Sequence, residues 1–315
     1  MKVVAISMVR NEADVIEAFV RHHAELVDEL IVVDHSSIDG TTELLGGLAS
    51  EGLPLAVRRE VSPAQRQNAV LTELMREAAA GGADWIVPLD GDEFLLAPGS
   101  DLHGSLARLP PRPHTAELRL YVPSAGDPEG EPNVLRRIRN RRLAEPRLWL
   151  QKVVVPAGSA SDPGLVLAQG SHALVEAGSA GYLPADTGPL AIAHFPVRSP
   201  EQLARKVLGG WPANLARPDR RRREAWQWKR AFDAVAAGEH LAPGALEALA
   251  LDWGTENPGE PGELVLDPVP VTFALRYRPP SPPSPLEVLA ATAEALADEL
   301  CAARRSETVE EPVSA

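Results

Sequence analysis

The stretch Trp85-Ile86-Val87-Pro88-Leu89-Asp90-Gly91-Asp92 decides the fold, because an apolar run ends there in two carboxylates. A continuous apolar run without polar alternation is typical of a strand that is buried on both faces of a sheet. Val3–Met8 and Leu30–Val33 repeat this pattern, and Leu55–Arg59 is a third segment of strand length. The sequence therefore predicts four strands in its first ninety residues.

Amphipathic segments separate these strands. Asn11 is a predicted N-cap for a helix that carries Val15, Phe19, His22 and Leu26 at helical spacing. Asp39 is placed to cap a second helix, which runs through Leu48. Ser62-Pro63 begins a third, which ends at Gly81-Gly82. Alternating strands and helices predict an α/β fold, with a Rossmann-like, mostly parallel sheet, right-handed crossovers and helices on both faces.

The composition limits the classes of function. The 315-residue chain has a net charge of −13, with 44% hydrophobic and 24% charged residues. This charge argues against binding to nucleic acid or to an anionic membrane. The single cysteine, Cys301, rules out an intramolecular disulfide framework. No signal peptide and no transmembrane segment is recognisable, so we expect a soluble, cytoplasmic protein.

The pattern changes after Asp101, where prolines become frequent and indicate loops over the sheet. Further strands are predicted at Leu148–Val155 and Leu190–Phe195. We predict three regions: an α/β domain over residues 1–198, a mainly helical extension over 199–278, and a terminal region over 279–315. The terminal region combines a proline-rich linker, an amphipathic helix over Leu286–Ala303 and an acidic tail.

Polar residues cluster where the predicted strands end. They are Arg10-Asn11-Glu12, Asp34-His35-Ser36-Ser37 and Asp90-Gly91-Asp92-Glu93. Ligands of open α/β sheets bind outside the carboxyl ends of the strands, so we expect these residues in one crevice. Two carboxylates separated by one small residue suit a hard divalent cation, Mn²⁺ or Mg²⁺. Such an ion neutralises a diphosphate leaving group, which is what transfer from a nucleotide sugar requires.

Four motifs together resemble glycosyltransferase family 2, in particular the branch related to family 92. They are Val3 to Glu12, Ile31 to Thr41, Gln65-Arg66-Gln67-Asn68-Ala69 and Ala83 to Phe94, and their order and spacing match across about a third of the chain. The resemblance implies a GT-A fold and a D-x-D-E-F metal motif. It also implies a nucleotide-sugar donor, UDP-linked by family frequency, and a hexosyltransferase of inverting type.

The resemblance also implies roles for individual residues. It places Ser7, Val9, Asn11 and Glu12 around the nucleotide pocket and Asp34 at the base or ribose. Arg66 and Asn68 are expected beside the base or diphosphate. Asp90 and Gly91 are expected at the ribose or metal, and Asp92 is expected to be the main metal ligand. Each of these residues also has a plain structural alternative, since capping residues are common at strand–helix turns.

The second half resembles the same branch more loosely. Lys152, His172, His194, Arg198 and Lys206 fit its later motifs. The resemblance makes His194 the first choice for a C-terminal metal ligand and His172 the second, with structural histidines as the alternative. Arg198 and Lys206 are expected to meet the diphosphate, although a solvated helix face explains Lys206 nearly as well.

The catalytic base is where the sequence departs from the family, because no acidic pair follows the metal motif. Asp186 is the nearest candidate, with Glu176 behind it, and a turn-forming role explains Asp186 at least as well. The resemblance implies an acceptor hydroxyl, and the sequence does not distinguish a carbohydrate, a lipid-linked molecule and a natural product as the molecule that carries it.

Other interpretations remain open. The motif Asp90-Gly91-Asp92-Glu93-Phe94 differs by one residue from the GGDEF signature of diguanylate cyclases, but that motif lies on a hairpin. A catalytically degenerate nucleotide-binding or scaffold protein is the non-enzymatic alternative. Arg220–Arg223 is either a solvated helix face or a site for an anionic acceptor. The stripe Leu286, Leu289, Ala293, Leu296 and Leu300 either docks on its own domain or pairs in a homodimer.

Overall fold

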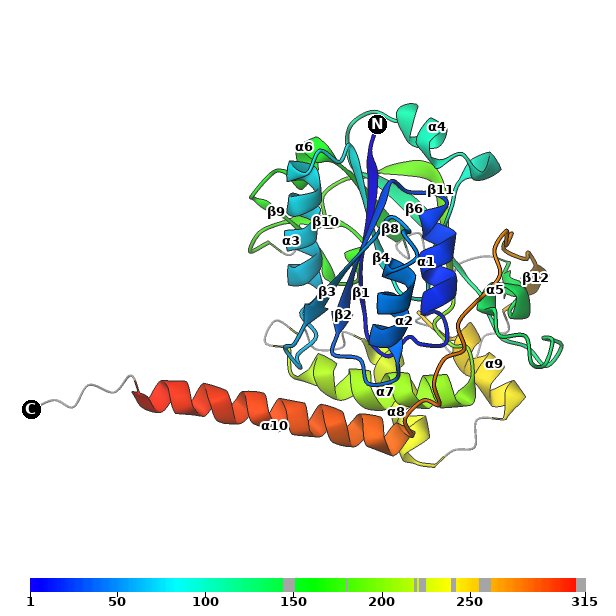
Figure 1. Ribbon diagram of the computed structural model, residues 1–315, viewed down its shortest axis with the longest axis vertical. Helices are drawn as coiled ribbons and strands as arrows, with labels where there is room; N and C mark the ends of the chain where they lie inside the picture. The colour runs from blue at the N-terminus through cyan, green and yellow to red at the C-terminus, as the bar shows by residue number, and fades with distance from the viewer. Residues whose placement is uncertain are drawn as a thin grey trace, which may run out of the picture.

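The computed structural model describes residues 1–143, 151–179, 181–217, 220, 225–238, 242–254 and 262–309. Within these residues an eight-stranded sheet lies between helices (Figure 1). Its strands, in spatial order, are β3 (Leu55–Glu60), β2 (Glu29–His35), β1 (Val3–Val9), β4 (Trp85–Asp90), β8 (Gln151–Pro156), β6 (His114–Leu120), β11 (Asp186–His194) and β5 (Glu93–Leu96).

The first half of the sheet is parallel, as predicted. Strands β3, β2, β1 and β4 pair in parallel, whereas β8 runs antiparallel to both β4 and β6. Strand β11 is parallel to β6 and antiparallel to β5. The connecting helices of the parallel half are α1 (Ile16–Ala24), α2 (Thr41–Ala49) and α3 (Gln67–Ala80).

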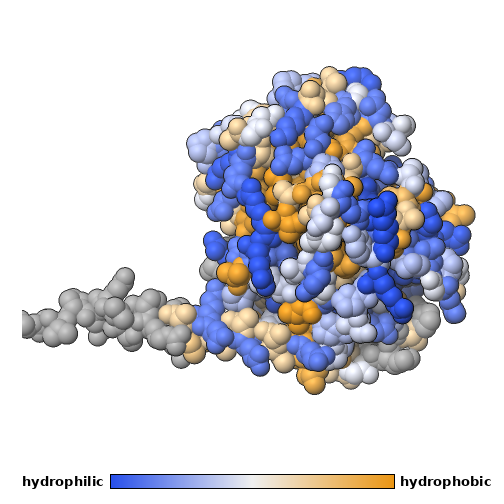
Figure 2. All heavy atoms as spheres, in the orientation of Figure 1, coloured by the Kyte–Doolittle hydropathy of each residue, from blue (hydrophilic) through white to orange (hydrophobic). Residues whose placement is uncertain are grey.

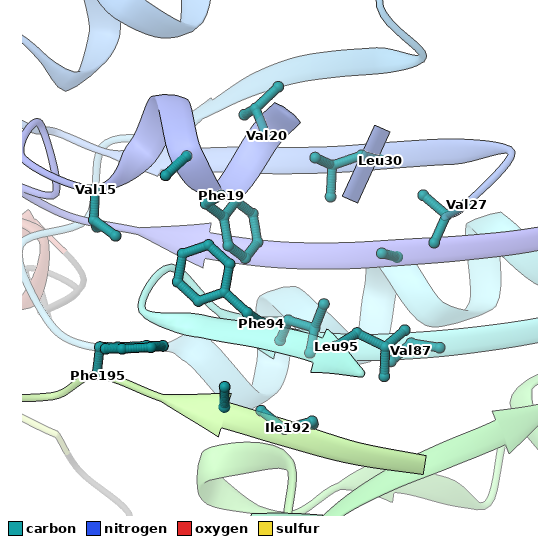
Figure 3. Close-up of a cluster of buried hydrophobic side chains, with 14 of the residues drawn as sticks. Val15, Phe19, Val20, Val27, Leu30, Val87, Phe94, Leu95, Ile192 and Phe195 are labelled. Atoms are coloured by element: carbon teal, nitrogen blue, oxygen red, sulfur yellow. The ribbon is translucent and has the colours of Figure 1, made fainter. Parts of the chain in front are cut away.

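Helices cover both faces of the sheet, which confirms the predicted α/β class. Successive side chains of β1 alternate between two cores, because neighbouring residues of a strand point to opposite faces. Val3 and Ala5 join the core that contains α1 and α2, whereas Val4 and Ile6 join the core beneath α3. Figure 3 shows the first core, where Phe19 of α1 and Phe94 of β5 pack edge to face.

Two predicted helix starts are wrong. Helix α1 begins at Ile16 without a side-chain cap, and Asn11 instead has a positive φ of 56° in the turn after β1. Helix α3 begins at Gln67 rather than at Ser62-Pro63. In both places a polar turn precedes the helix, and the sequence pattern does not separate a turn of this kind from a first helical turn.

Shorter elements complete the region after β5. They are η1 (Pro98–Ser100), α4 (Leu102–Ala107), α5 (Val134–Arg137), β7 (Asn140–Arg142), α6 (Ala157–Ala160), β9 (Leu165–Leu167), η2 (Gln169–Ser171) and β10 (Leu174–Glu176). The later part contains α7 (Pro200–Leu215), α8 (Trp226–Ala236), α9 (Pro243–Leu251), β12 (Leu264–Leu266) and α10 (Pro285–Val309).

The region predicted as a helical extension is helical only through α9. After β12, which pairs with β7, residues 267–278 run in extended form along α1 and α2 (Figure 1). Val269 is buried there, and Phe273 packs against the first core. The backbone N–H groups of Arg276 and Tyr277 donate to the carboxylate of Glu17. This returning segment therefore belongs to the body of the α/β domain.

The C-terminal helix α10 docks on α7, along the base of the molecule in Figures 1 and 2. The docking face contains Val288 and Thr292, each 1% exposed. The predicted apolar stripe is a different face, since Leu286 is 71% and Leu300 is 54% exposed. Among the described helices, none has the length and apolar composition needed to cross a bilayer. Helix α10 continues beyond the predicted end at Ala303 to Val309, and residues 310–315 of the tail lie outside the described residues.

Candidate active site

A cavity of about 1380 Å³ lies at the carboxyl ends of β1 and β4. Small-molecule sites typically occupy roughly 300–1,000 Å³, so this cavity has room for two substrates. Of the predicted site residues, those that line it are Val9, Asn11, Glu12, Asn68, Asp90, Gly91, Asp92, His172, His194 and Lys206. The expected crevice at the strand ends is therefore present, and it gathers residues from both halves of the chain.

The pairing of β5 with β11 brings the acidic motif and His194 together. His194 is the register partner of Glu93 across these two antiparallel strands. The backbone N–H of Phe195 donates to the carbonyl oxygen of Asp92 at 2.8 Å. Asp92 and His194, which lie about a hundred positions apart in the sequence, are thus held close together by the backbone hydrogen bonds between these strands.

The carboxylate of Asp92 faces the basic side chains of three residues, Lys206, Arg198 and His194. Its Oδ2 lies 2.5 Å from Lys206 Nζ and 3.7 Å from Arg198 Nη1, and its Oδ1 lies 3.5 Å from His194 Nε2. Burial alone would raise the pKa of Asp92, but the charges of Lys206 and His194 outweigh it and hold the pKa well below its usual value. Asp92 is therefore a carboxylate anion at neutral pH.

Asp90 belongs to a second charge cluster. Lys152, which is fully buried, lies 3.0 Å from Asp90 Oδ2 and 2.9 Å from Glu93 Oε2. The side chain of Gln67 donates to Asp90 Oδ1 at 2.6 Å. Burial and the neighbouring Asp90 raise the pKa of Glu93 to about 7. Lys152 is therefore an internal counter-ion beneath the cavity rather than one of its lining residues.

Arg198 holds a third cluster together. Its guanidinium donates to Glu12 and to both carboxylate oxygens of Asp14, at 2.7 and 2.8 Å, and its side chain is fully buried. Burial raises the pKa of Glu12 to about 7, because the opposing charge of Arg198 offsets only part of the desolvation. Arg198 was predicted to contact a diphosphate, but its guanidinium is paired with Glu12 and Asp14 of the loop after β1. The sequence did not indicate Asp14 as a partner.

The two candidate histidines differ in their surroundings. His172 Nδ1 donates to the carbonyl oxygen of Gln151 at 2.7 Å, and burial, followed by the charge of Lys152, lowers the pKa of His172 to about 4. His194 faces Asp92 through Nε2, while its buried Nδ1 has no hydrogen-bond partner among the described residues.

The residues present fit a divalent metal in part. Within the described residues, no group of three or more His, Cys, Asp or Glu side chains is arranged to hold an ion. Two ligand atoms that each lie about 2.1 Å from one ion are separated by roughly 3–3.5 Å. The 3.5 Å between Asp92 Oδ1 and His194 Nε2 matches this separation. A metal here would take these two atoms from the protein, with phosphate oxygens and water completing its coordination.

Asp34 lies near the carboxyl end of β2 and is 1% exposed. Its Oδ1 accepts from the backbone N–H of Ser37 at 3.1 Å, and its Oδ2 accepts from the hydroxyl of Thr42. Asp34, Ser7 and the exposed Arg66 do not appear among the described residues that line the cavity. Gln65 and Gln67, the two neighbours of Arg66, line it instead.

The predicted catalytic bases lie away from the cavity. Asp186 begins β11, at the opposite end of that strand from His194, and pairs with Arg112 at 2.6 Å. At about 3.3 Å per residue, the two ends of β11 are roughly 26 Å apart. Glu176 is exposed, while its neighbour Val175 lines the cavity, and adjacent strand residues face opposite sides. The prediction that Asp186 lies over the same crevice as Asp92 and His194 is therefore wrong. The length of β11 separates Asp186 from His194.

Comparisons with known proteins give likenesses in structure but none in sequence. No protein-family model matches the chain, and no curated protein is similar to it in sequence. Among solved structures, it is similar to the mannosyltransferase PcManGT from Pyrobaculum calidifontis, solved in complex with GDP-Man and Mn²⁺. The sequences are 17% identical, the match covers 99% of this chain and 81% of that chain, and the TM-score is 0.40.

The cavity also contains residues that sequence reasoning missed. Trp226, Trp228 and Trp253 line it from the helical region, and Arg205 and Arg217 add positive charge. Helical spacing does not distinguish a core face from a cavity wall, so the sequence pattern does not assign these tryptophans to a site. Arg220 lies over the ring of Trp211, 4.9 Å from its centroid. The other arginines of the predicted basic run lie outside the described residues. The same holds for the first residues of the predicted strand Leu148–Val155, which include Trp149 and Leu150.

Proposed function

We propose that this chain is a glycosyltransferase that transfers a sugar from a nucleotide-diphosphate sugar to an acceptor hydroxyl. The observation that carries the proposal is the meeting of Asp92 and His194 at the floor of a cavity at the carboxyl ends of parallel strands. That arrangement agrees with the family 2 resemblance of the four N-terminal motifs. We take a UDP-sugar as the first donor to test, and a carbohydrate, a lipid-linked molecule or a natural product as the acceptor.

Asp92 and His194 would hold Mn²⁺ or Mg²⁺, which supplies charge neutralisation for the diphosphate leaving group. Asn11 and Gln67 offer hydrogen-bonding groups along the wall where the nucleotide would lie. Asp90 is kept in place by Lys152 and Gln67, so its carboxylate does not have to be ordered when a ligand binds.

In this proposal the catalytic base is a carboxylate that lines the cavity, in place of Asp186. The described carboxylates that line the cavity are Glu12, Asp90, Asp92 and Glu93. Glu12 is the member of this group that lies outside the metal motif, and we assign it the removal of the acceptor proton. A positioned base typically contributes ~10²–10⁴-fold to the rate.

The first test compares two acidic residues at opposite ends of β4. Asp92→Asn should abolish Mn²⁺- or Mg²⁺-dependent binding of UDP, because an amide loses the charge that attracts the ion. Asp84→Asn is the matched control, since Asp84 is 57% exposed near the amino end of the same strand. Isothermal titration with UDP, with and without Mn²⁺, measures the effect, and circular dichroism checks the fold. Equal UDP affinity in Asp92→Asn and in the unaltered chain would remove the metal assignment.

A degenerate binding or scaffold protein is the second candidate. Lys206 and Lys152 already neutralise Asp92 and Asp90, so the site is held together by the chain's own charges. Slow, metal-dependent hydrolysis of a UDP-sugar, lost in Glu12→Gln, supports the enzyme. Nucleotide binding without any hydrolysis or transfer across a panel of donors supports the scaffold.

A further inference from the structure

The ammonium group of Lys206 is held by several partners at once. Its Nζ lies 2.5 Å from Asp92 Oδ2 and 3.3 Å from the carbonyl oxygen of Pro196. It also lies 5.7 Å from the ring centroids of both Trp228 and Trp253, within reach of a cation–π attraction. Helix α7 therefore presents a cation to the same carboxylate that the proposed function assigns to the metal.

A metal ion and this ammonium compete for Asp92. Both are attracted by one carboxylate, and two cations bound to it at once repel each other strongly in a partly desolvated cavity. Arg198 Nη1, at 3.7 Å from the same Oδ2, adds further positive charge. Binding of a divalent ion to the ligand-free protein therefore requires Lys206 to move or costs this repulsion.

A diphosphate changes this balance. Its anionic oxygens accept charge-assisted hydrogen bonds from an ammonium, so Lys206 gains a new partner in the cavity that it already lines. The flexible stem of lysine allows the ammonium to pass from Asp92 to a phosphate without movement of α7. Asp92 is then free for the ion, whose remaining coordination the same diphosphate can supply.

We propose that Lys206 is a tethered counter-ion of Asp92 that couples metal binding to diphosphate binding. This inference rests on the proposed function, because it takes Asp92 as a metal ligand and a nucleotide diphosphate as the donor group. The metal binds weakly to the ligand-free protein and tightly once the nucleotide is present. By linkage, the metal raises nucleotide affinity by the same factor. Lys206 is a binding residue in this scheme, because its ammonium contacts the diphosphate.

The test measures Mn²⁺ affinity by electron paramagnetic resonance of free Mn²⁺, without nucleotide and with saturating UDP or GDP. In the unaltered chain, the nucleotide should tighten Mn²⁺ binding by about tenfold or more, within the usual range of coupling. In Lys206→Met, Mn²⁺ should bind the nucleotide-free protein several-fold more tightly, and the effect of UDP on Mn²⁺ affinity should shrink. UDP affinity without metal should fall in the same variant, because an ammonium partner of the diphosphate is gone.

Two further variants serve as controls. Lys206→Arg keeps the positive charge and should retain the coupling. Lys229→Met removes an exposed lysine on α8 that pairs with Asp233, and it should leave both affinities unchanged. Melting temperatures confirm that each variant is folded.

The outcomes separate this inference from the proposed function. If the unaltered chain binds Mn²⁺ and UDP but with independent affinities, the coupling is absent and the inference fails while the function stands. Unchanged or weaker Mn²⁺ binding by folded, nucleotide-free Lys206→Met also overturns it. If neither UDP nor GDP binds at any Mn²⁺ concentration, the proposed function fails, and the inference fails with it.

Discussion

At the scale of single residues, the acidic motif shows how surroundings divide similar side chains. Asp90 is paired with the internal Lys152, whereas Asp92 faces His194 and Lys206 at the cavity floor. The two carboxylates are separated by one glycine, whose missing side chain leaves room for Val9 and Glu12. A Cβ at Gly91 would lie 2.8 Å from Val9 Cγ1, so close packing requires glycine there.

Asp34 gives a prediction at this scale. Because Asp34 accepts hydrogen bonds from Ser37 and Thr42, its loss leaves a half-buried N–H without this acceptor, and an unsatisfied buried donor typically costs about 1–3 kcal/mol. Asp34→Ala should therefore lower the free energy of unfolding by this amount, measured by urea denaturation. If the residue also binds the base or ribose, UDP affinity should fall roughly five- to hundred-fold. Unaltered stability would contradict the structural role, and unaltered UDP affinity would contradict the binding role.

At the scale of elements, the contact between α1 and β5 depends on a neutral histidine. His23 is fully buried; its Nδ1 donates to the carbonyl oxygen of Phe19, and its Nε2 accepts from the backbone N–H of Leu95. Burial, with a smaller effect from His22, holds the pKa of His23 well below its usual value. Protonation would both charge a buried ring and break the bond from Leu95.

The contribution of His23 to stability should therefore decrease as the pH falls. His23 stays neutral in the folded chain but takes up a proton in the unfolded chain below its ordinary pKa of about 6.5. At this residue the unfolded state then binds more protons, so the contribution of His23 to the free energy of unfolding should drop by up to about 1.4 kcal/mol per pH unit below pH 6.5. Glu12 and Glu93, whose pKa values are raised to about 7, contribute with the opposite sign over the same range. Urea denaturation between pH 7.5 and 5.5 measures this slope. His23→Gln should remove this contribution, so the slopes of the variant and the unaltered chain should differ, and equal slopes would exclude His23 as a source.

The docking of α10 on α7 gives the second prediction at this scale. A Cβ added at Gly209 would lie 2.8 Å from Val288 Cγ1, and valine is stiff at χ1. Gly209→Ala should destabilise the chain by about 1 kcal/mol or more through overpacking. Gly46→Ala in α2 is the matched control: an added Cβ there meets nothing within 4 Å, so it should stabilise by about 0.5–1 kcal/mol. Urea denaturation compares the two variants.

A compensating change tests the cause of the Gly209 effect. Val288→Ala makes room for the added methyl group, so it should cost less in the Gly209→Ala background than in the unaltered chain. Additive effects of the two substitutions would show that Gly209→Ala acts elsewhere than at α10.

At the scale of the whole molecule, the three predicted regions share their cores. Leu203 and Val207 of α7 cover Leu120 and Val122 after β6, and the returning segment 267–278 packs along α1 and α2. The predicted boundary at residue 198 therefore cuts through packed surfaces. The body of the fold includes α7 and the returning segment.

Truncation tests this arrangement. Residues 1–198 alone should lack a cooperative unfolding transition, because Phe273 and Val269 no longer cover the first core and Glu17 loses its two backbone donors. Residues 1–278, which keep this cover and lose α10, should still unfold cooperatively but at a lower urea concentration. Circular dichroism against urea measures both. A sharp transition of residues 1–198 at the midpoint of the full chain would contradict the shared core.

The sequence by itself determined the parallel half of the fold and the acidic motif at its edge. Continuous apolar runs and amphipathic segments are local signals, so β1 to β4, α2 and the crevice at the strand ends could be predicted. These local signals did not identify the partners of the site, and His194, Arg198 and Lys206 were indicated by the family resemblance alone. Only the antiparallel return of β11 beside β5 places His194 at Asp92, and only the docking of α7 brings Lys206 there. The same topology carries Asp186 to the far end of β11 and takes Arg198 to Glu12 and Asp14. These pairings join residues that are far apart in the chain. A local sequence pattern therefore does not show at which end of a strand a side chain will meet its partners.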